Sequence, residues 1–373
     1  MMHALTSTFR LAVVYQLLAG LLLVMASACG GAEGTGPSTQ TLEPADSTAA
    51  IPNDSSAVPT DSSAIPPADS SAAPPPDSSA APPTDSTATT PEDSSGISTA
   101  ILDTRSRLPG IVFASNNMSS TYFNSIHTGA KRGGITPENV ISVLTDARAR
   151  GARLVLKFSL PDPYIQNSDG TFNFTKWKDL VNRYRNVDLN TFIADGTLLG
   201  HFLIDEPHMA NKWGGKIVPQ ATVEAMAQYS KQIWPYVNTL VHTKMTWLAS
   251  TSVTYHYLDA GWVQYASSKG PVSTWASTEI SNAKAKGLGL VMGLNILNGG
   301  NGSSGIRGTK SGKYSMSASE LRSYGTTILD QTYACAFVMW EHKPTYYDRT
   351  DIASAMSALS LKAKAHVKTS CRQ

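Results

Sequence analysis

The chain has 373 residues, of which 41% are hydrophobic and 16% are charged, and its formal net charge is +2. This charge averages two unlike parts, because residues 31–99 hold ten of the 28 acidic residues and no lysine or arginine, whereas residues 100–373 carry 29 basic and 18 acidic side chains. The three cysteines, Cys29, Cys335 and Cys371, are too few for a disulfide-dense scaffold and form no Cys-x-x-Cys pair of a structural zinc site.

Residues 1–28 have the pattern of an export signal. A polar start with Arg10 precedes the apolar run Leu11–Met25, which is too short for a comfortable membrane span and is followed by small residues. The sequence Ala26-Ser27-Ala28-Cys29 resembles the lipobox of bacterial lipoproteins, in which the cysteine is acylated and becomes the mature N-terminus. It departs from that pattern at Ala26, where leucine is commoner. The alternative is an ordinary signal peptide cut before an unmodified cysteine.

The resemblance implies an exported protein anchored to the lipid membrane of the cell envelope through Cys29. Gly30 resembles the sorting pattern for the outer membrane, if the host has one. Residues 29–99 repeat an acidic, serine- and proline-rich unit and contain no aromatic residue, so they cannot bury enough apolar surface to fold. We expect a disordered tether that ends near residue 99.

Residues 100–373 alternate short apolar runs with amphipathic stretches, which predicts a parallel sheet covered by helices. Seven runs are expected to be strands: Ile111–Ser115, Arg153–Ser159, Leu198–Asp205, Lys244–Leu248, Gly261–Tyr265, Leu288–Ile296 and Ala334–Trp340. Six stretches are expected to be helices: Thr136–Arg150, Lys176–Arg185, Ala221–Trp234, Thr274–Lys286, Ala318–Leu329 and Asp351–Val367.

The length and the alternation of this part predict an α/β fold of the (β/α)₈ TIM-type barrel, with one strand irregular or absent. Thr239–Thr243 could extend one of the seven strands. A doubly wound open sheet is the competing fold, but no Gly-x-Gly-x-x-Gly opens the first helix, which disfavours a nucleotide-binding version.

Active sites of such barrels lie where the strands end, so the polar residues after each apolar run are the candidate site. Carboxylates, amides and aromatic rings gather there, a combination that suits a sugar, because acids and amides bond hydroxyl groups and rings stack on apolar sugar faces. Asp205, Glu206 and Glu341 are the candidate catalytic acids. The candidate substrate-binding residues are Lys157, Trp247, Gln264, Tyr265, Asn295 and Trp340.

The segment Gly200-His-Phe-Leu-Ile-Asp-Glu-Pro207 resembles the strand-end acid motifs of (β/α)-barrel glycoside hydrolases, in which the glutamate is the proton donor. The adjacent Asp-Glu pair looks most like the hexosaminidase-type barrels, where the aspartate orients the acetamido group of the substrate. Phe337-Val-Met-Trp-Glu341 resembles the last strand of cellulase-like barrels. In the two-glutamate clan the acids follow the fourth and seventh strands, whereas here they follow the third and seventh of the expected strands.

These resemblances imply an exported glycoside hydrolase in which Glu206 protonates the leaving oxygen and Asp205 stays ionised. The second group would be Glu341 or the acetamido group of the substrate. The alternative is a carbohydrate-binding lipoprotein with a degenerate, non-catalytic barrel. Asp205 and Glu206 could also cap the next helix or pair with Lys157, and Glu341 could be a surface acid.

No cofactor or metal is expected, because the histidines lack the spacing of a zinc helix. The excess of basic residues could favour an anionic glycan or a lipid surface. Equally, several of these residues fall at helix ends, where cations are stabilising, namely Arg148, Arg150, Arg153, Lys284 and Lys286. Nucleic acid is not an expected partner of an exported, anchored protein, and we expect a monomer.

Cys335 and Cys371 are expected to form a disulfide. The last strand of a βα barrel starts at the bottom face and the following helix runs back toward it, so the chain after Asp351–Val367 should return close to Ala334. Export permits the oxidation.

Lipid on Cys29 is the first testable expectation, since small residues precede this cysteine and a tether follows it. Metabolic labelling with a palmitate analogue should mark the wild type and leave the Cys29→Ser variant unmarked. Persistent labelling of the variant would refute lipid attachment at this position.

Overall fold

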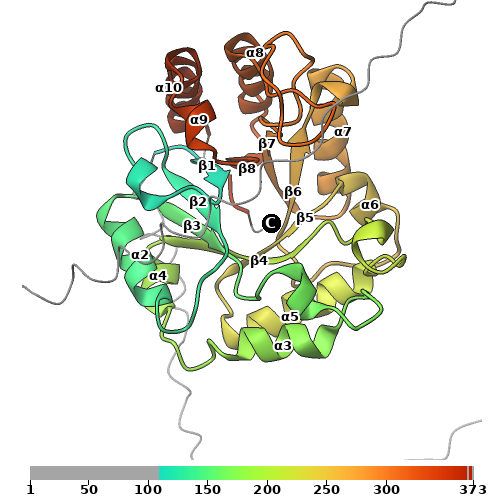
Figure 1. The fold of residues 1–373 in the computed structure, drawn as a ribbon. Helices are drawn as coiled ribbons and strands as arrows, with labels where there is room; N and C mark the ends of the chain where they lie inside the picture. The colour runs from blue at the N-terminus through green and yellow to red at the C-terminus, as the bar shows by residue number, and fades with distance from the viewer. Residues whose placement is uncertain (1–108, 368, 372–373) are drawn as a thin grey trace, which may run out of the picture. The chain divides into compact units, whose positions relative to one another are not determined.

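The computed structural model describes residues 109–367 and 369–371, so the expected signal, the tether and Cys29 lie outside the described residues. Eight parallel strands form a closed barrel in sequence order, with β1 paired to β8 (Figure 1). The strands are β1 Val112–Asn116, β2 Gly129–Arg132, β3 Arg153–Leu156, β4 Leu198–Asp205, β5 Asn238–His242, β6 Ala260–Tyr265, β7 Gly289–Leu294 and β8 Ala334–Met339. The predicted (β/α)₈ barrel is confirmed.

Helices surround the barrel and alternate with the strands (Figure 1). They are α2 Val140–Ala149, α3 Phe174–Asn182, α4 Asn190–Ala194, α5 Gln220–Ile233, α6 Met245–Ala249, α7 Val272–Ala285, α8 Ala318–Leu329, α9 Pro344–Tyr347 and α10 Thr350–Ala365. Local sequence fixes some of these starts. Ser317 and Glu320 form a reciprocal capping box before α8, and Asn173 accepts a hydrogen bond from the Lys176 N–H at the start of α3. Within the described residues, no helix is long and apolar enough to span a membrane.

Two strands differ from the sequence-based expectation. β2 was not expected, because its sequence Gly-Ala-Lys-Arg is short and half basic. The expected strand Lys244–Leu248 is wrong, since Met245–Ala249 is the helix α6, and the strand before it is β5. β5 includes most of the stretch Thr239–Thr243 that was considered only as an extension. With both strands counted, Leu198–Asp205 becomes the fourth strand and Ala334–Met339 the eighth.

The apolar core has two shells, one on each side of the barrel wall. Alternate side chains of the strands fill the interior, among them Val155, Phe202, Leu240, Trp262 and Val338. The other set packs outward against the helices in a larger cluster. Because successive side chains of a strand point to opposite faces, this interior set identifies which residues further along each strand face the barrel axis.

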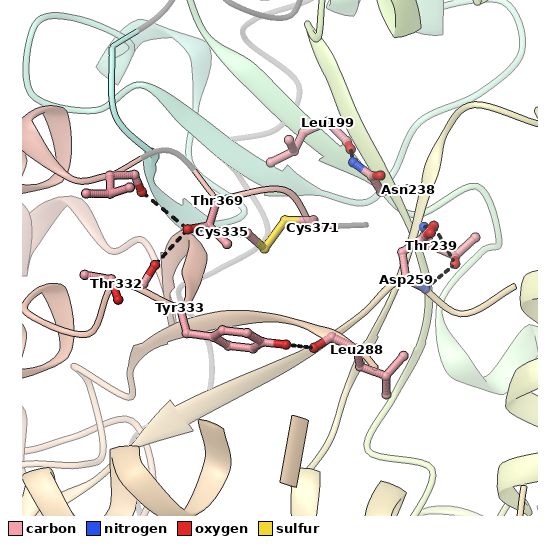
Figure 2. Close-up of a disulfide and its surroundings, with 11 residues drawn as sticks. Leu199, Asn238, Thr239, Asp259, Leu288, Thr332, Tyr333, Cys335, Thr369 and Cys371 are labelled. Atoms are coloured by element: carbon pink, nitrogen blue, oxygen red, sulfur yellow. Dashed lines mark hydrogen bonds between the residues drawn. A yellow bond between two sulfur atoms is a disulfide. The ribbon is translucent and has the colours of Figure 1, made fainter. Parts of the chain in front are cut away.

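A disulfide joins Cys335 in β8 to Cys371, and their Cα atoms lie 5.2 Å apart (Figure 2). The pairing of β7 with β8 shifts by one residue between Ala334 and Ala336, and Cys335 lies with the interior side chains. Thr369 adds a second attachment, because its hydroxyl donates to the Thr332 carbonyl at 2.7 Å. The segment after α10 is therefore fastened to the amino-terminal end of the barrel.

Replacing both Cys335 and Cys371 by serine should lower the free energy of unfolding by about 3–4 kcal/mol on the chain-entropy model. The reason is that the bond closes a loop with a sequence separation of 36 residues. Equilibrium unfolding in denaturant measures the difference, and Cys29→Ser is the control that should leave it unchanged. Two free thiols at Cys335 and Cys371 in non-reducing mass spectrometry would contradict the bond.

Candidate functional site

The interior of the barrel changes from apolar to polar at the carboxyl ends of the strands. Inward-facing side chains recur every second residue along a strand. At the next inward-facing position toward the carboxyl end, most of the strands carry a polar side chain, and these side chains surround the mouth. They are Asn116, Lys131, Lys157, Asp205, His242, Gln264 and Trp340. Lys131, for example, borders the small interior void together with Phe202 and Trp262, and its Nζ lies 4.6 Å from the centre of the Phe202 ring. This mouth is the candidate functional site.

A shift in the pairing of β4 decides which of its two terminal acids faces the interior. Phe202 pairs with Leu240 and Asp205 with His242, so β4 advances three residues while β5 advances two. Strict alternation from the inward-facing Phe202 would turn Asp205 outward, and the extra residue turns it inward instead. Glu206 then adopts a left-handed backbone with φ 49°, and its N–H donates to the His242 carbonyl at 2.8 Å.

Asp205 is the centre of an ion-pair network in the mouth. Its Oδ1 lies 2.7 Å from His242 Nδ1, and its Oδ2 accepts a hydrogen bond from Lys212. Lys212 also lies 3.1 Å from Asp162 Oδ2, and Lys157 donates to the other oxygen of Asp162 at 2.7 Å. The sequence-based alternative that Asp205 pairs with Lys157 is wrong, because Lys157 pairs with Asp162.

The network keeps Asp205 ionised. Burial alone would raise the pKa of this carboxyl, but the hydrogen bond and charge of His242, together with Lys212, outweigh burial and hold the pKa far below its usual range. The same contacts act on Lys212, where burial lowers the pKa but the carboxylates of Asp205 and Asp162 raise it above its usual value. Asp205 is therefore a fixed negative charge and not a proton donor.

Glu206 and Glu341 are the less enclosed carboxylates of the mouth. The Glu206 side chain is 40% exposed, and its Oε2 lies 3.9 Å from Lys212 Nζ. Glu341 follows β8 after a cis peptide bond with Trp340, is partly buried, and accepts a hydrogen bond from Asn117 Nδ2 at 3.3 Å. Because β4 and β8 are four strands apart in a closed eight-stranded barrel, the two glutamates follow strands on opposite sides of the mouth.

Lys131 places Asp205 and Glu341 in one electrostatic environment. Burial, together with the charge of Lys157, lowers the pKa of Lys131 to about 8. The carboxylates of Asp205, Asp162 and Glu341 act in the opposite direction. Asp205 and Glu341 both lie within electrostatic reach of Lys131.

The structure brings together only some of the candidate binding residues. Gln264 faces the mouth with 7% exposure, and its Nε2 has no hydrogen-bond partner in the described part of the chain. Trp340 packs against the interior cluster, and Asn295 lies beside it in an isolated bridge after β7. Trp247 lies in the helix α6, which follows β5, and its ring centre is 6.1 Å from that of His208.

Tyr265 does not reach the mouth. It points out of the barrel, is 2% exposed, and packs against Trp275 and Tyr324. Its hydroxyl donates to the Gly270 carbonyl. The physical reason is the two-residue period of β6, because the neighbouring Gln264 takes the inward position and leaves Tyr265 to the outer core.

Sequence reasoning missed four residues of the mouth: Asn116, Lys131, Lys212 and His242. Lys131 and His242 belong to the two strands that were not recognised, and Asn116 is the residue directly after the expected first strand. The signal that could have found His242 is its position directly before Thr243, at the end of an apolar run. Lys212 is placed by a short 3₁₀ turn, Ala210–Lys212, and no local sequence signal marks it as a site residue.

Within residues 109–367 and 369–371, no cluster of three or more histidine, cysteine or acidic side chains is arranged to hold a metal ion. His201 of β4 has the environment of a structural core residue. It is fully buried, its Nδ1 lies 2.8 Å from Ser230 Oγ, and burial lowers its pKa to about 3.

Comparison with known proteins gives structural likeness only. No family model and no curated protein sequence matches the chain. The solved structures that resemble it include a xylanase, TsXylA, from Thermoanaerobacterium saccharolyticum, with 10% identity and a TM-score of 0.43 over 64% of this chain and 87% of that one. A putative α-L-fucosidase from Bacteroides thetaiotaomicron has 9% identity and a TM-score of 0.44, over 69% and 95% of the two chains.

A third similar structure is that of Gas2p from Saccharomyces cerevisiae, in complex with laminaritetraose and laminaripentaose. It has 12% identity and a TM-score of 0.42, over 72% of this chain and 68% of that one. At such identities and scores the likeness does not bear on the reaction of this chain, for which the side chains of the mouth are the relevant observation.

Asp205→Asn should lower the free energy of unfolding by about 3 kcal/mol near neutral pH, since it removes one partner of a largely buried ion-pair network. The folded-state pKa of Asp205 lies below its unfolded-state value, so its stabilising contribution is present above the unfolded value of about 3.9 and is lost as the pH falls below it. The difference between variant and wild type should therefore shrink in acid.

Denaturant unfolding at a series of pH values between about 7 and 3 measures this difference. Asp179→Asn is the matched control, because Asp179 is exposed on α3, and its effect should stay within about 0.5 kcal/mol at every pH. An Asp205→Asn effect that is small, or that grows toward acid pH, would contradict the ionised network.

Proposed function

We propose that the barrel is an O-glycoside hydrolase whose mouth binds an oligo- or polysaccharide, with Glu206 as the proton donor. One observation carries the proposal: Glu206 and Glu341 follow β4 and β8, on opposite sides of a mouth with a polar floor. A pair of carboxyl groups that flank the scissile bond is the arrangement that glycoside hydrolysis uses. Counting β2 places Glu206 after the fourth strand, where the two-glutamate clan has its first acid.

Each side chain of the mouth has a role in this proposal. Glu206 protonates the leaving oxygen, and Glu341, or the acetamido group of the substrate, acts at the sugar carbon. Glu341 follows the eighth strand, whereas Asn295 stands at the end of the seventh, where the two-glutamate clan has its second acid. Asp205 stays ionised and fixes Lys212 and His242.

Substrate recognition in the proposal rests on amides and one ring. Asn116 and Gln264 face the mouth, and both amide atoms of Asn116 and the Nε2 of Gln264 have no hydrogen-bond partner. Buried amide groups without partners are costly, and sugar hydroxyls would supply the missing hydrogen bonds. Trp340 offers an apolar face for a sugar ring.

The second candidate function is carbohydrate binding without cleavage. The observation that favours it is that Asp205, the central acid of the ion-pair network, has contacts from both oxygens to structural partners, His242 and Lys212. A carboxylate held by two structural partners has fewer lone pairs left with which to orient a substrate group. In this version the mouth binds glycans, and Glu206 has no chemical role.

We also propose that the protein acts outside the cytoplasm, held at the cell envelope by lipid on Cys29. The Cys335–Cys371 disulfide supports export, because such bonds persist in oxidising compartments. A tether of about 70 residues would let the barrel reach substrates away from the membrane surface.

Glu206→Gln should lower the rate of hydrolysis of a natural glycan by about 10²- to 10⁴-fold, the usual contribution of a general acid. Hydrolysis of an aryl glycoside with a good leaving group should fall much less, because its leaving oxygen needs little protonation. The measurement is a comparison of kcat/KM on both substrate types, after the wild type has identified a glycan in a hydrolysis screen.

Glu138→Gln is the control, since Glu138 is exposed before α2, and both rates should remain at the wild-type level. Full activity of Glu206→Gln on the natural glycan would remove Glu206 from the mechanism. Saturable glycan binding with no hydrolysis of any substrate by the wild type would replace the enzyme by the binding module.

A further inference from the structure

A cavity of about 290 Å³ lies at the amino ends of the strands, at the opposite end of the barrel from the mouth. Its lining includes the first residues of three strands, Arg153 of β3, Leu198 of β4 and Asn238 of β5. The disulfide of Cys335 and Cys371 forms another part of the lining (Figure 2). At about 30 Å³ for each water-sized group, this space has room for on the order of ten non-hydrogen atoms.

Arg153 brings an uncompensated positive charge to this cavity. Its sequence-based placement among the cations at helix ends is wrong, because it begins β3 and alternates with the inward-facing Val155. Its Nε is buried without a hydrogen-bond partner, and within the described part of the chain no carboxylate forms an ion pair with it. Burial lowers its pKa to about 10, with no neighbouring acid to oppose the shift.

This environment differs from that of every lysine network in the mouth. Lys157 and Lys212 are balanced by Asp162 and Asp205, whereas Arg153 has no such partner among the described residues. An unpaired charge that is taken out of water is costly, and the cost falls when a counter-ion supplies the missing hydrogen bonds. The guanidinium fork suits a carboxylate in particular, because it can donate two parallel hydrogen bonds.

Asn238 adds an acceptor to the lining of the same cavity. Its Nδ2 donates to the Leu199 carbonyl at 2.8 Å, which fixes the orientation of the amide (Figure 2). Its Oδ1 is buried and has no hydrogen-bond partner among the residues that the structure describes. An oxygen in this position can only accept a hydrogen bond. A ligand that satisfies Arg153 and Asn238 together therefore carries an anionic group and a hydroxyl donor.

The wall that the segment 369–371 contributes is tightly fitted. A Cβ atom placed on Gly289 of β7 would lie 2.6 Å from the Cys371 carbonyl oxygen, so only glycine lets this segment approach the strand so closely. The disulfide and the Thr369 hydroxyl hold the segment in place. This segment is thus a fixed wall of the cavity.

We propose that this cavity is a second ligand site, which binds a small hydroxycarboxylate through the Arg153 guanidinium and the Asn238 Oδ1. The site is at the far end of the barrel from the mouth, so it is independent of the proposed hydrolase activity. It depends on side chains from β3 and β5 and on the wall that the disulfide fastens.

Calorimetric titration with glycerate tests the site, with glycerol as the analogue without charge and propionate as the analogue without hydroxyl groups. The wild type should bind glycerate saturably, bind propionate more weakly and show no binding of glycerol. Arg153→Met should weaken glycerate binding by about 10- to 100-fold, the usual effect of losing a hydrogen bond to a charged group. Arg150→Met is the matched control, because Arg150 is exposed and paired with Asp146.

A second readout separates a binding role from a structural one. Without ligand, Arg153→Met should unfold at the same or a higher temperature than the wild type, because it removes an unpaired, partly buried charge. Asn238→Ala should bind glycerate and propionate with equal affinity. Absence of glycerate binding by the wild type, or unchanged binding by Arg153→Met, would overturn the site, and a retained preference for glycerate in Asn238→Ala would overturn the role of the amide.

Discussion

Closure of the barrel by the pairing of β1 with β8 is the constraint on which the rest of this structure depends. Val112 pairs with Ala336 and Ser115 with Met339, so the first and last strands complete a ring in which all strands are parallel. The carboxyl ends of all the strands then lie at the mouth, and the amino ends lie at the opposite end of the barrel. Residues more than two hundred positions apart, such as Asn117 and Glu341, become neighbours for this reason.

Charged side chains are paired differently at the two ends of the barrel. At the mouth, Lys157 and Lys212 alternate with Asp162 and Asp205, so that each of these four charges has an opposite partner. At the other end, Arg153 has no described partner and faces a cavity. Desolvation penalises an unpaired ion far more than a paired one, so the first arrangement is consistent with a self-sufficient scaffold for a site, and the second with a requirement for a ligand.

One irregular step in β4 connects the fold to the proposed chemistry. The extra residue between Phe202 and Asp205 turns Asp205 into the network and leaves Glu206 at the rim in a left-handed conformation. A division of roles between adjacent acids follows from this placement. The inner acid is held ionised by His242 and Lys212, and the outer acid keeps access to solvent and to a substrate.

The sequence by itself determined the fold class, six of the eight strands and the position of the acids at a strand end, because apolar runs and amphipathic periodicity are local properties. It missed β2, whose inward position at the mouth is the polar Lys131, and it took the helix α6 for a strand. Only the tertiary structure decided that Asp205 faces inward, that Tyr265 faces outward and that Arg153 stands unpaired. The side of the barrel wall toward which a side chain points depends on strand register. Register is set by pairing between strands that are distant in sequence, so no local sequence pattern determines this direction.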